Sequence, residues 1–101
     1  MTLRHTFTYR WRAWRVFSAS MAELKRAARS RTNLVGLCSS ELAEIIVWEG
    51  LDENARRSTI RHELIHAVSD CAGIGLTHKQ VYALEHELGP LVRLSFEEGG
   101  G

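Results

Sequence analysis

Residues 52–71, with the sequence DENARRSTIRHELIHAVSDC, decide how this chain folds. At the 100° per residue of an α-helix, the apolar side chains of this segment fall on one stripe. The stripe consists of Ile60, Leu64, Ala67, Val68 and Cys71. Residues 72–76 break the pattern, and Gly73 stands where helices commonly end. The segment therefore predicts one long helix that buries the apolar stripe and presents its opposite face to a cleft or to a second element.

This helix carries the run His62-Glu63-Leu64-Ile65-His66, which has the pattern HExxH. Residues four apart lie one turn above each other on a helix, so both imidazoles can bind one metal ion. Glu63 is rotated away from the pair, yet its carboxylate can reach a water molecule on that ion. Zinc lowers the pKa of such a water to about 7, and a carboxylate can then accept its proton during attack on a carbonyl. We therefore predict that His62 and His66 bind Zn²⁺ and that Glu63 is the catalytic base.

A catalytic zinc ion takes three protein ligands and leaves its fourth position to water. Ser69 and Ala72 stand where a metzincin has Gly and His, so that class of metallopeptidase is excluded. The candidates for the third ligand follow later in the chain. They are His78, Glu85, His86 and Glu87.

A second helix is predicted over residues 78–94, with Thr77 and Gln80 forming a capping box at its start. Pro90 is expected to interrupt or kink it near residues 89–90. The stripe that faces inward is expected to consist of Val81, Leu84, Leu88, Leu91 and Val92.

The orientation of the acidic and histidine side chains on this second helix separates the candidate ligands. Glu85 borders the inward stripe, whereas His86 and Glu87 point away from it. A carboxylate that borders an apolar stripe needs a partner. Glu85 is therefore the predicted third zinc ligand, and His78, one heptad earlier on the same side, is the alternative.

The N-terminal half of the chain contains the strand patterns. Residues 3–16 alternate between apolar or aromatic and polar positions, which predicts a β-strand. A helix capped by Ser18 or Ser20 is expected to run through residues 21–28 and to end near residues 32–33. Two short strands, at residues 34–38 and 44–49, complete the pattern. The expected fold is an α+β domain in which a small, largely antiparallel sheet packs on the HExxH helix.

The HExxH motif, followed by eighteen intervening residues and then Glu85, resembles the gluzincin metallopeptidases. Residues 33–95 more widely resemble small zincin-like proteins of phages and bacteria. This resemblance implies that residues 1–101 form one minimal zincin-like domain. It also implies that the strand at residues 44–49 lies at the sheet edge beside the cleft and binds peptide by strand addition. Tyr82 and His78 are the nearby candidates for a donor to the transition state.

The composition is that of one soluble globular domain: 101 residues, 45% hydrophobic, 25% charged, with a net charge of +1. No apolar run approaches the about 20 residues that span a membrane, and the N-terminus lacks the apolar core of a secretory signal. We therefore expect a location in the cytoplasm of a bacterium or of a phage-infected host cell. Cys38 and Cys71 are predicted to be neither bridged nor zinc ligands, because Cys71 lies nearly opposite the histidines.

The leading hypothesis is a zinc metallopeptidase that hydrolyses peptide bonds of a peptide or protein substrate by a metal-activated water. The alternative is a non-catalytic, zinc-stabilised module that binds protein or nucleic acid. Glu63 separates the two hypotheses, because a structural zinc site needs no general base. A third hypothesis assigns nucleic-acid binding to the Arg- and Trp-rich residues 10–15. No membrane partner is expected.

Overall fold

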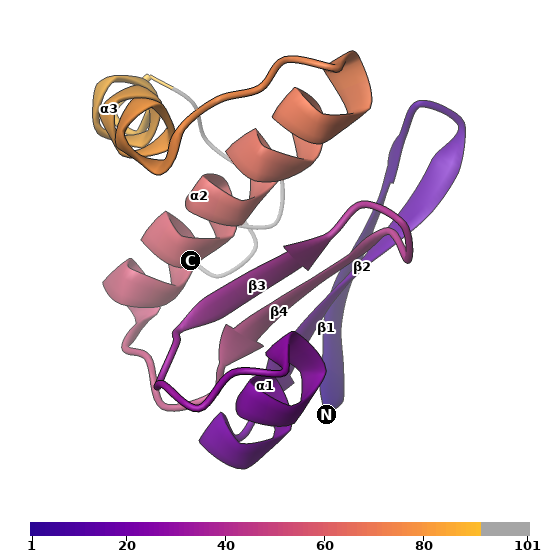
Figure 1. Ribbon diagram of the computed structural model, residues 1–101, viewed down its shortest axis with the longest axis vertical. Coiled ribbons are helices and arrows are strands. Elements are labelled where there is room, and N and C mark those ends of the chain that lie inside the picture. The colour runs from indigo at the N-terminus through magenta and orange to yellow at the C-terminus, as the bar shows by residue number, and fades with distance from the viewer. Residues whose placement is uncertain (92–101) are drawn as a thin grey trace.

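The computed structural model describes residues 1–91, which form one four-stranded sheet and three helices (Figure 1). In chain order the elements are β1 (Thr2–Tyr9), β2 (Arg12–Ala19), α1 (Met21–Ala28), β3 (Gly36–Ser39), β4 (Glu44–Trp48), α2 (Glu53–Ala72) and α3 (His78–Leu88). The α+β class expected from the sequence is confirmed. Among the helices of residues 1–91, none is both long and apolar enough to cross a membrane.

The sheet is mixed, with the strand order β1-β2-β4-β3. Strand β1 pairs antiparallel with β2, and β3 pairs antiparallel with β4. The central pair, β2 and β4, is parallel, because the chain crosses over through α1 between them. Two of the three pairings are thus antiparallel, in agreement with the predicted largely antiparallel sheet. The parallel pair in the middle was not predicted.

The predicted single N-terminal strand is a hairpin. The turn between β1 and β2 is formed by Arg10 and Trp11, whose φ angles of 53° and 65° are both positive. Two-residue hairpin turns of this kind normally use Asn and Gly, which tolerate positive φ. Neither residue type is present here, so the alternating pattern continues through the turn without a break. For this reason the sequence predicted one long strand.

The place of β4 in the sheet corrects the expectation taken from the zincin resemblance. Residues 44–48 form a strand, as predicted, but this strand lies in the interior of the sheet between β2 and β3. The edge strand on that side is β3. The parallel pairing of β4 with β2 joins residues that are about thirty positions apart, from Arg15 with Glu44 to Ala19 with Trp48. Local sequence patterns carry no signal for such a pairing.

The two faces of the sheet are covered by different helices (Figure 1). Helix α2 packs on one face, where its Ile60 and Ala67 contact a cluster from the strands. That cluster consists of Trp14, Val16, Ala43, Ile45 and Val47. Helix α1 packs on the other face, with Leu24 buried against Ala19 and Ile46. Helix α3 packs against α2.

The caps predicted from the sequence are largely confirmed. Ser20 forms a capping box at the start of α1, and Thr77 forms one with Gln80 at the start of α3. The helical pattern was predicted to begin at Asp52, and this residue is the N-cap of α2; Gly73, the predicted end, has a φ of 69°. Helix α1 ends at Ala28 rather than near residues 32–33, because Arg29 adopts the left-handed conformation of a C-cap. Helix α3 ends at Leu88, and the predicted continuation beyond residue 91 lies outside the described residues.

The buried face of α2 differs from the predicted stripe. Ile60 and Ala67 are buried as expected, but Val68 is 46% exposed, and Glu63 is buried instead with 7% of its surface exposed. The helix is rotated so that Glu63 lies against β3, where Gly36 offers no side chain and leaves room for the carboxylate. Cys38 and Cys71 are free thiols, as predicted.

Candidate metal centre

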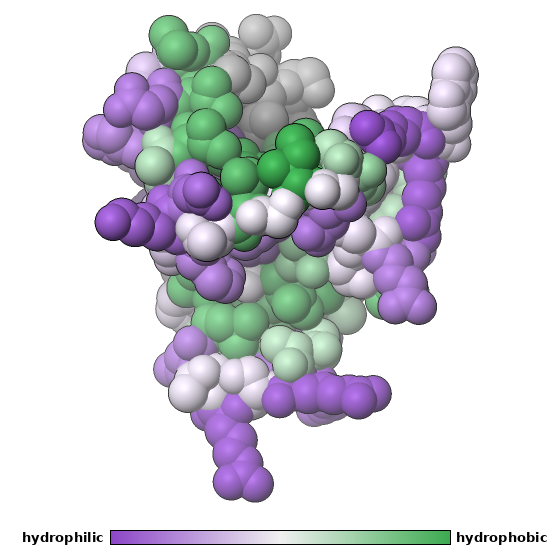
Figure 2. Space-filling model, turned by 45° about the horizontal axis from the view of Figure 1, so that its top comes forward, coloured by the Kyte–Doolittle hydropathy of each residue, from purple (hydrophilic) through white to green (hydrophobic). Residues whose placement is uncertain are grey.

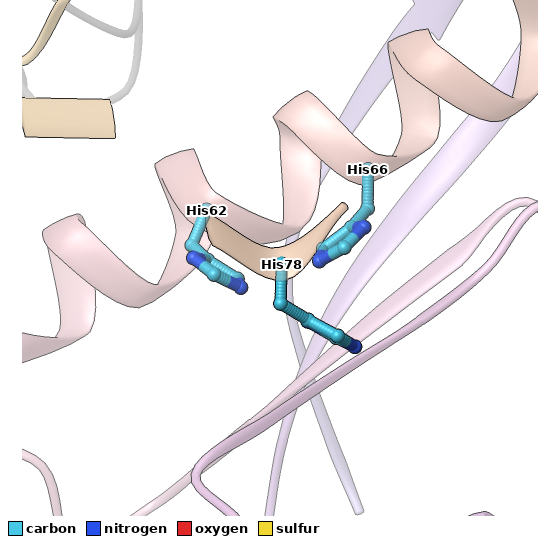
Figure 3. A group of neighbouring side chains, drawn as sticks. All are labelled: His62, His66 and His78. Carbon is cyan, nitrogen blue, oxygen red and sulfur yellow. The ribbon is translucent and has the colours of Figure 1, made fainter. Parts of the chain in front are cut away.

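Three imidazoles converge where the start of α3 meets the middle of α2. His62 and His66 lie one turn apart on α2, and His78 is the first residue of α3 (Figure 3). The ring centroid of His66 is 4.9 Å from that of His62 and 5.2 Å from that of His78. One ring nitrogen of each histidine lies within 4.8 Å of the others. Three imidazoles at this spacing form a donor set that suits Zn²⁺.

The reversal of the chain after α2 brings His78 to the pair. Gly73 adopts the left-handed conformation, and residues 74–76 then lead back to α3 (Figure 1). Thr77 caps the new helix and sets its first turn, so the ring of His78 lies beside that of His66. The loop and its cap therefore complete the cluster, which the HExxH motif alone leaves with two members.

Glu85 lies behind the cluster. Its Oε2 is 3.1 Å from Nδ1 of His62, and its Oε1 accepts a hydrogen bond from the hydroxyl of Ser58. The carboxylate, predicted as the third ligand, is not among the three groups that converge. His86 and Glu87 are exposed, which agrees with their predicted direction. Ser58 was not singled out in the sequence, although it precedes His62 by one turn and so shares its face of α2.

Glu63 faces the space between α2 and the edge strand. Burial raises the pKa of its carboxyl to about 7, which is well above the usual range for glutamate. A carboxyl with a pKa near neutrality can accept and return a proton at physiological pH. Burial, and then the neighbouring His62 and His78, lowers the pKa of His66. The low pKa favours the neutral imidazole, which is the form that binds metal.

These groups line a cleft of about 430 Å³ between α2, α3 and the segment that leads into β3. Tyr82 also lines the cleft, and its ring packs on His62 with 4.6 Å between centroids. Tyr82 is 62% exposed. Of the two candidate donors named from the sequence, His78 belongs to the histidine cluster, and Tyr82 lines the cleft beside it.

A second hollow, of about 490 Å³, lies between α2 and α3 on a different side. Its lining is apolar and includes Leu64, Val68 and Leu88. Figure 2 shows hydrophobic residues gathered over α3 and the segment that joins it to α2. Among the described residues of the inward stripe predicted for α3, Val81 is buried, whereas Leu84 and Leu88 are exposed at this hollow and Leu91 is exposed as well. The histidines and Glu63 line the other cleft.

The arginines of the β1–β2 hairpin have contacts within the protein. Arg10 donates a hydrogen bond of 2.7 Å to the backbone carbonyl of Cys71, and Arg12 donates to those of Ser40 and Glu41. These bonds attach the hairpin tip to the end of α2 and to the β3–β4 connection. They give the two guanidinium groups a structural role, and the nucleic-acid hypothesis for residues 10–15 stays a prediction.

The fit between α2 and the edge strand depends on Gly36. A Cβ atom at this position would lie 2.6 Å from Cγ2 of Thr59 and 3.3 Å from Cγ of Glu63. We therefore expect Gly36→Ala to lower the free energy of unfolding by about 1–3 kcal/mol, as overpacking usually does. Chemical denaturation measures this change. Gly75→Ala is the control, because a Cβ there meets nothing within 4 Å. Equal stability of the two variants would contradict the expectation.

Comparisons with known proteins leave the site to be interpreted from its own geometry. No protein-family model matches the chain, and searches of curated proteins and of solved structures find no significant match. The resemblance to zincins therefore rests on the HExxH motif and on the elements around it.

Proposed function

We propose that this protein is a zinc-dependent metallopeptidase with a minimal zincin-like domain. The observation that carries the proposal is the position of Glu63. Its carboxyl is buried beside the histidine cluster, opens onto the same cleft, and has a pKa raised to about 7. A buried carboxyl in this state destabilises a fold, so its presence next to three imidazoles favours a chemical role over a structural one.

In this proposal each residue of the cleft has a separate role in hydrolysis. His62 and His66 would hold the zinc ion together with a third ligand from α3. When bound, zinc supplies Lewis-acid catalysis by polarising the substrate carbonyl and making water more acidic. Glu63 accepts a proton from the attacking water and delivers it to the amine that leaves. Tyr82, which is exposed at the mouth of the cleft, donates a hydrogen bond to the oxygen on which negative charge develops.

The substrate of this proposal is an extended peptide segment. The strand β3 is the edge of the sheet beside the cleft. Its first residue, Gly36, and the preceding Leu34 and Val35 line the cleft wall. An edge strand can hold a peptide through backbone hydrogen bonds. This role was predicted for residues 44–49, and β3 now takes their place in the proposal.

The alternative, a zinc-stabilised binding module, is supported by the same three histidines but not by their surroundings. Structural zinc sites are usually closed by four protein ligands. Here the three imidazoles line an open cleft, and Glu63 lies beside them. These two features favour catalysis.

Metal analysis of the purified protein tests the proposal most directly. We expect one equivalent of zinc per chain, and we expect hydrolysis of an unfolded protein such as casein to stop with a chelator and to return with added zinc. His66→Ala should lose the zinc, because a site with two remaining protein ligands binds weakly. His86→Ala is the matched control, since His86 is exposed on α3. A wild-type protein that binds no zinc would disprove the proposal.

A further inference from the structure

We propose that the third zinc ligand is His78, and that Glu85 instead holds the ring of His62 in place. This inference rests on the proposed function, because it concerns the same zinc site. The gluzincin resemblance implies a ligand set of two histidines and a glutamate. The set proposed here consists of three histidines, with the carboxylate of Glu85 holding one of their rings.

Two polar stripes meet where α3 packs on α2. On α2, Ser58, His62 and His66 follow each other at intervals of four residues and share one face. On α3, His78, Tyr82 and Glu85 also share one face, at intervals of four and three residues.

The contacts between the stripes run in opposite directions along the two helices. His78 lies beside His66, Tyr82 packs on His62, and Glu85 contacts Ser58 and His62. In this register the first residue of the α3 stripe lies at the metal cluster. Glu85, at the far end of the stripe, lies two turns away along α3.

Glu85 contacts only one of the two ring nitrogens of His62 among the described contacts. Oε2 of Glu85 is 3.1 Å from Nδ1. A carboxylate accepts hydrogen bonds, so Nδ1 carries the proton and Nε2 keeps the free lone pair that can bind metal. The two nitrogens point to different sides of the ring. A group that contacts Nδ1 therefore lies away from an ion bound at Nε2.

Both oxygens of Glu85 already have partners. Ser58 donates to Oε1, while Oε2 faces His62, and both side chains of the His62–Glu85 pair are largely buried, with 13% and 17% exposed. The carboxylate is thus directed at Ser58 and at Nδ1 of His62, and it is not among the groups that converge at the cluster. His78 has no such competing bond among the described contacts and already lies within 4.8 Å of the other two ligand atoms. A carboxylate behind a ligating histidine orients the ring and makes its nitrogen a better ligand.

Zinc affinity of the full-length protein, measured by competition with a chelating dye, separates the two assignments. We expect His78→Ala to lower the affinity by at least about 100-fold, because a ligand is lost. Glu85→Ala should lower it by about 10–100-fold, as loss of an orienting partner does. Glu85→Gln should change it by no more than a few fold, because the amide oxygen can still accept from Nδ1. His86→Ala is the control and should match the wild type.

The reverse pattern would overturn the inference. If Glu85→Gln loses as much affinity as Glu85→Ala while His78→Ala keeps its zinc, then Glu85 is the ligand, and the proposed peptidase survives with a different site. A protein that binds zinc as expected here but shows no hydrolysis would instead contradict the proposed function alone.

The metal-free protein provides a readout that does not depend on zinc or on activity. Nitrogen chemical shifts of the His62 ring distinguish its two neutral tautomers. We expect the Nδ1-protonated form in the wild type and in Glu85→Gln, and the loss of that preference in Glu85→Ala. If the wild type and Glu85→Ala show the same tautomer, Glu85 does not position the ring of His62. This outcome would disprove the positioning role whether or not the protein binds zinc.

Discussion

Replacing Glu63 by glutamine is expected to reduce zinc-dependent peptide hydrolysis by about 10²–10⁴-fold, which is the usual contribution of a general base. Glutamine has nearly the same size and cannot accept a proton from water. The zinc content should stay at the wild-type value, because Glu63 is not one of the three converging groups. Initial rates at saturating zinc, together with metal analysis of the same sample, measure both effects.

Glu87→Gln is the matched control, because Glu87 is exposed on α3. It removes one carboxylate from the same part of the molecule without touching the cleft. If Glu63→Gln and Glu87→Gln both retain full activity, Glu63 is not the base, and the binding-module alternative gains support.

Glu63→Gln should also change the way in which the free energy of unfolding of the metal-free protein depends on pH. The pKa of Glu63 is raised from 4.5 to about 7 by burial, so the folded state holds a proton that the unfolded state has released between these values. The wild type therefore loses stability as the pH rises from about 4.5 to 7. Since one pKa unit corresponds to about 1.4 kcal/mol, the cost above pH 7 is about 3 kcal/mol. Glu63→Gln should be more stable than the wild type at pH 8, with the difference shrinking towards pH 4.5, in thermal unfolding.

The second large effect is expected for Trp14→Ala, which should lower the free energy of unfolding by about 3–5 kcal/mol. Trp14 is 1% exposed and packs in the cluster that joins β2 and β4 to Ile60 and Ala67 of α2. Its ring also stacks on Phe7, with 5.9 Å between centroids. Removal of this side chain would weaken the packing of α2 on the sheet, and α2 carries His62 and His66. Denaturant unfolding measures the change.

Trp11→Ala provides the comparison within the same hairpin. Trp11 is fully exposed at the turn, so its removal deletes no packed side chain. We expect its stability to stay within about 0.5 kcal/mol of the wild type, as for most surface substitutions. A similar loss in both variants would show that the hairpin, and not the buried cluster, determines the effect.

The sequence by itself determined the features that depend on neighbours along the chain. The HExxH motif lies on a helix because its apolar residues have helical spacing, and the ends of α2 and α3 were found from Asp52, Gly73 and Thr77. The strand at residues 44–48 was found from its run of β-branched residues. His62, Glu63 and His66 were singled out for the same reason, since their spacing within one helix is local.

The tertiary structure decided what depends on pairs of residues far apart in the sequence. The parallel pairing of β2 with β4 placed β3 at the edge of the sheet, and no local pattern encodes that choice. The turn at Arg10 and Trp11 lacks the residues that normally mark a hairpin. The burial of Glu63 follows from its contact with Gly36, which is twenty-seven residues earlier in the chain.

The roles of His78 and Glu85 show the same division most clearly. Helical periodicity places both on one side of α3, and so the sequence left both open as ligands. Which of them meets His62 and His66, and which lies behind His62, depends on the register in which α3 packs on α2. That register is determined by the loop after Gly73 and by side-chain contacts across the two helices, and therefore only the folded structure shows it.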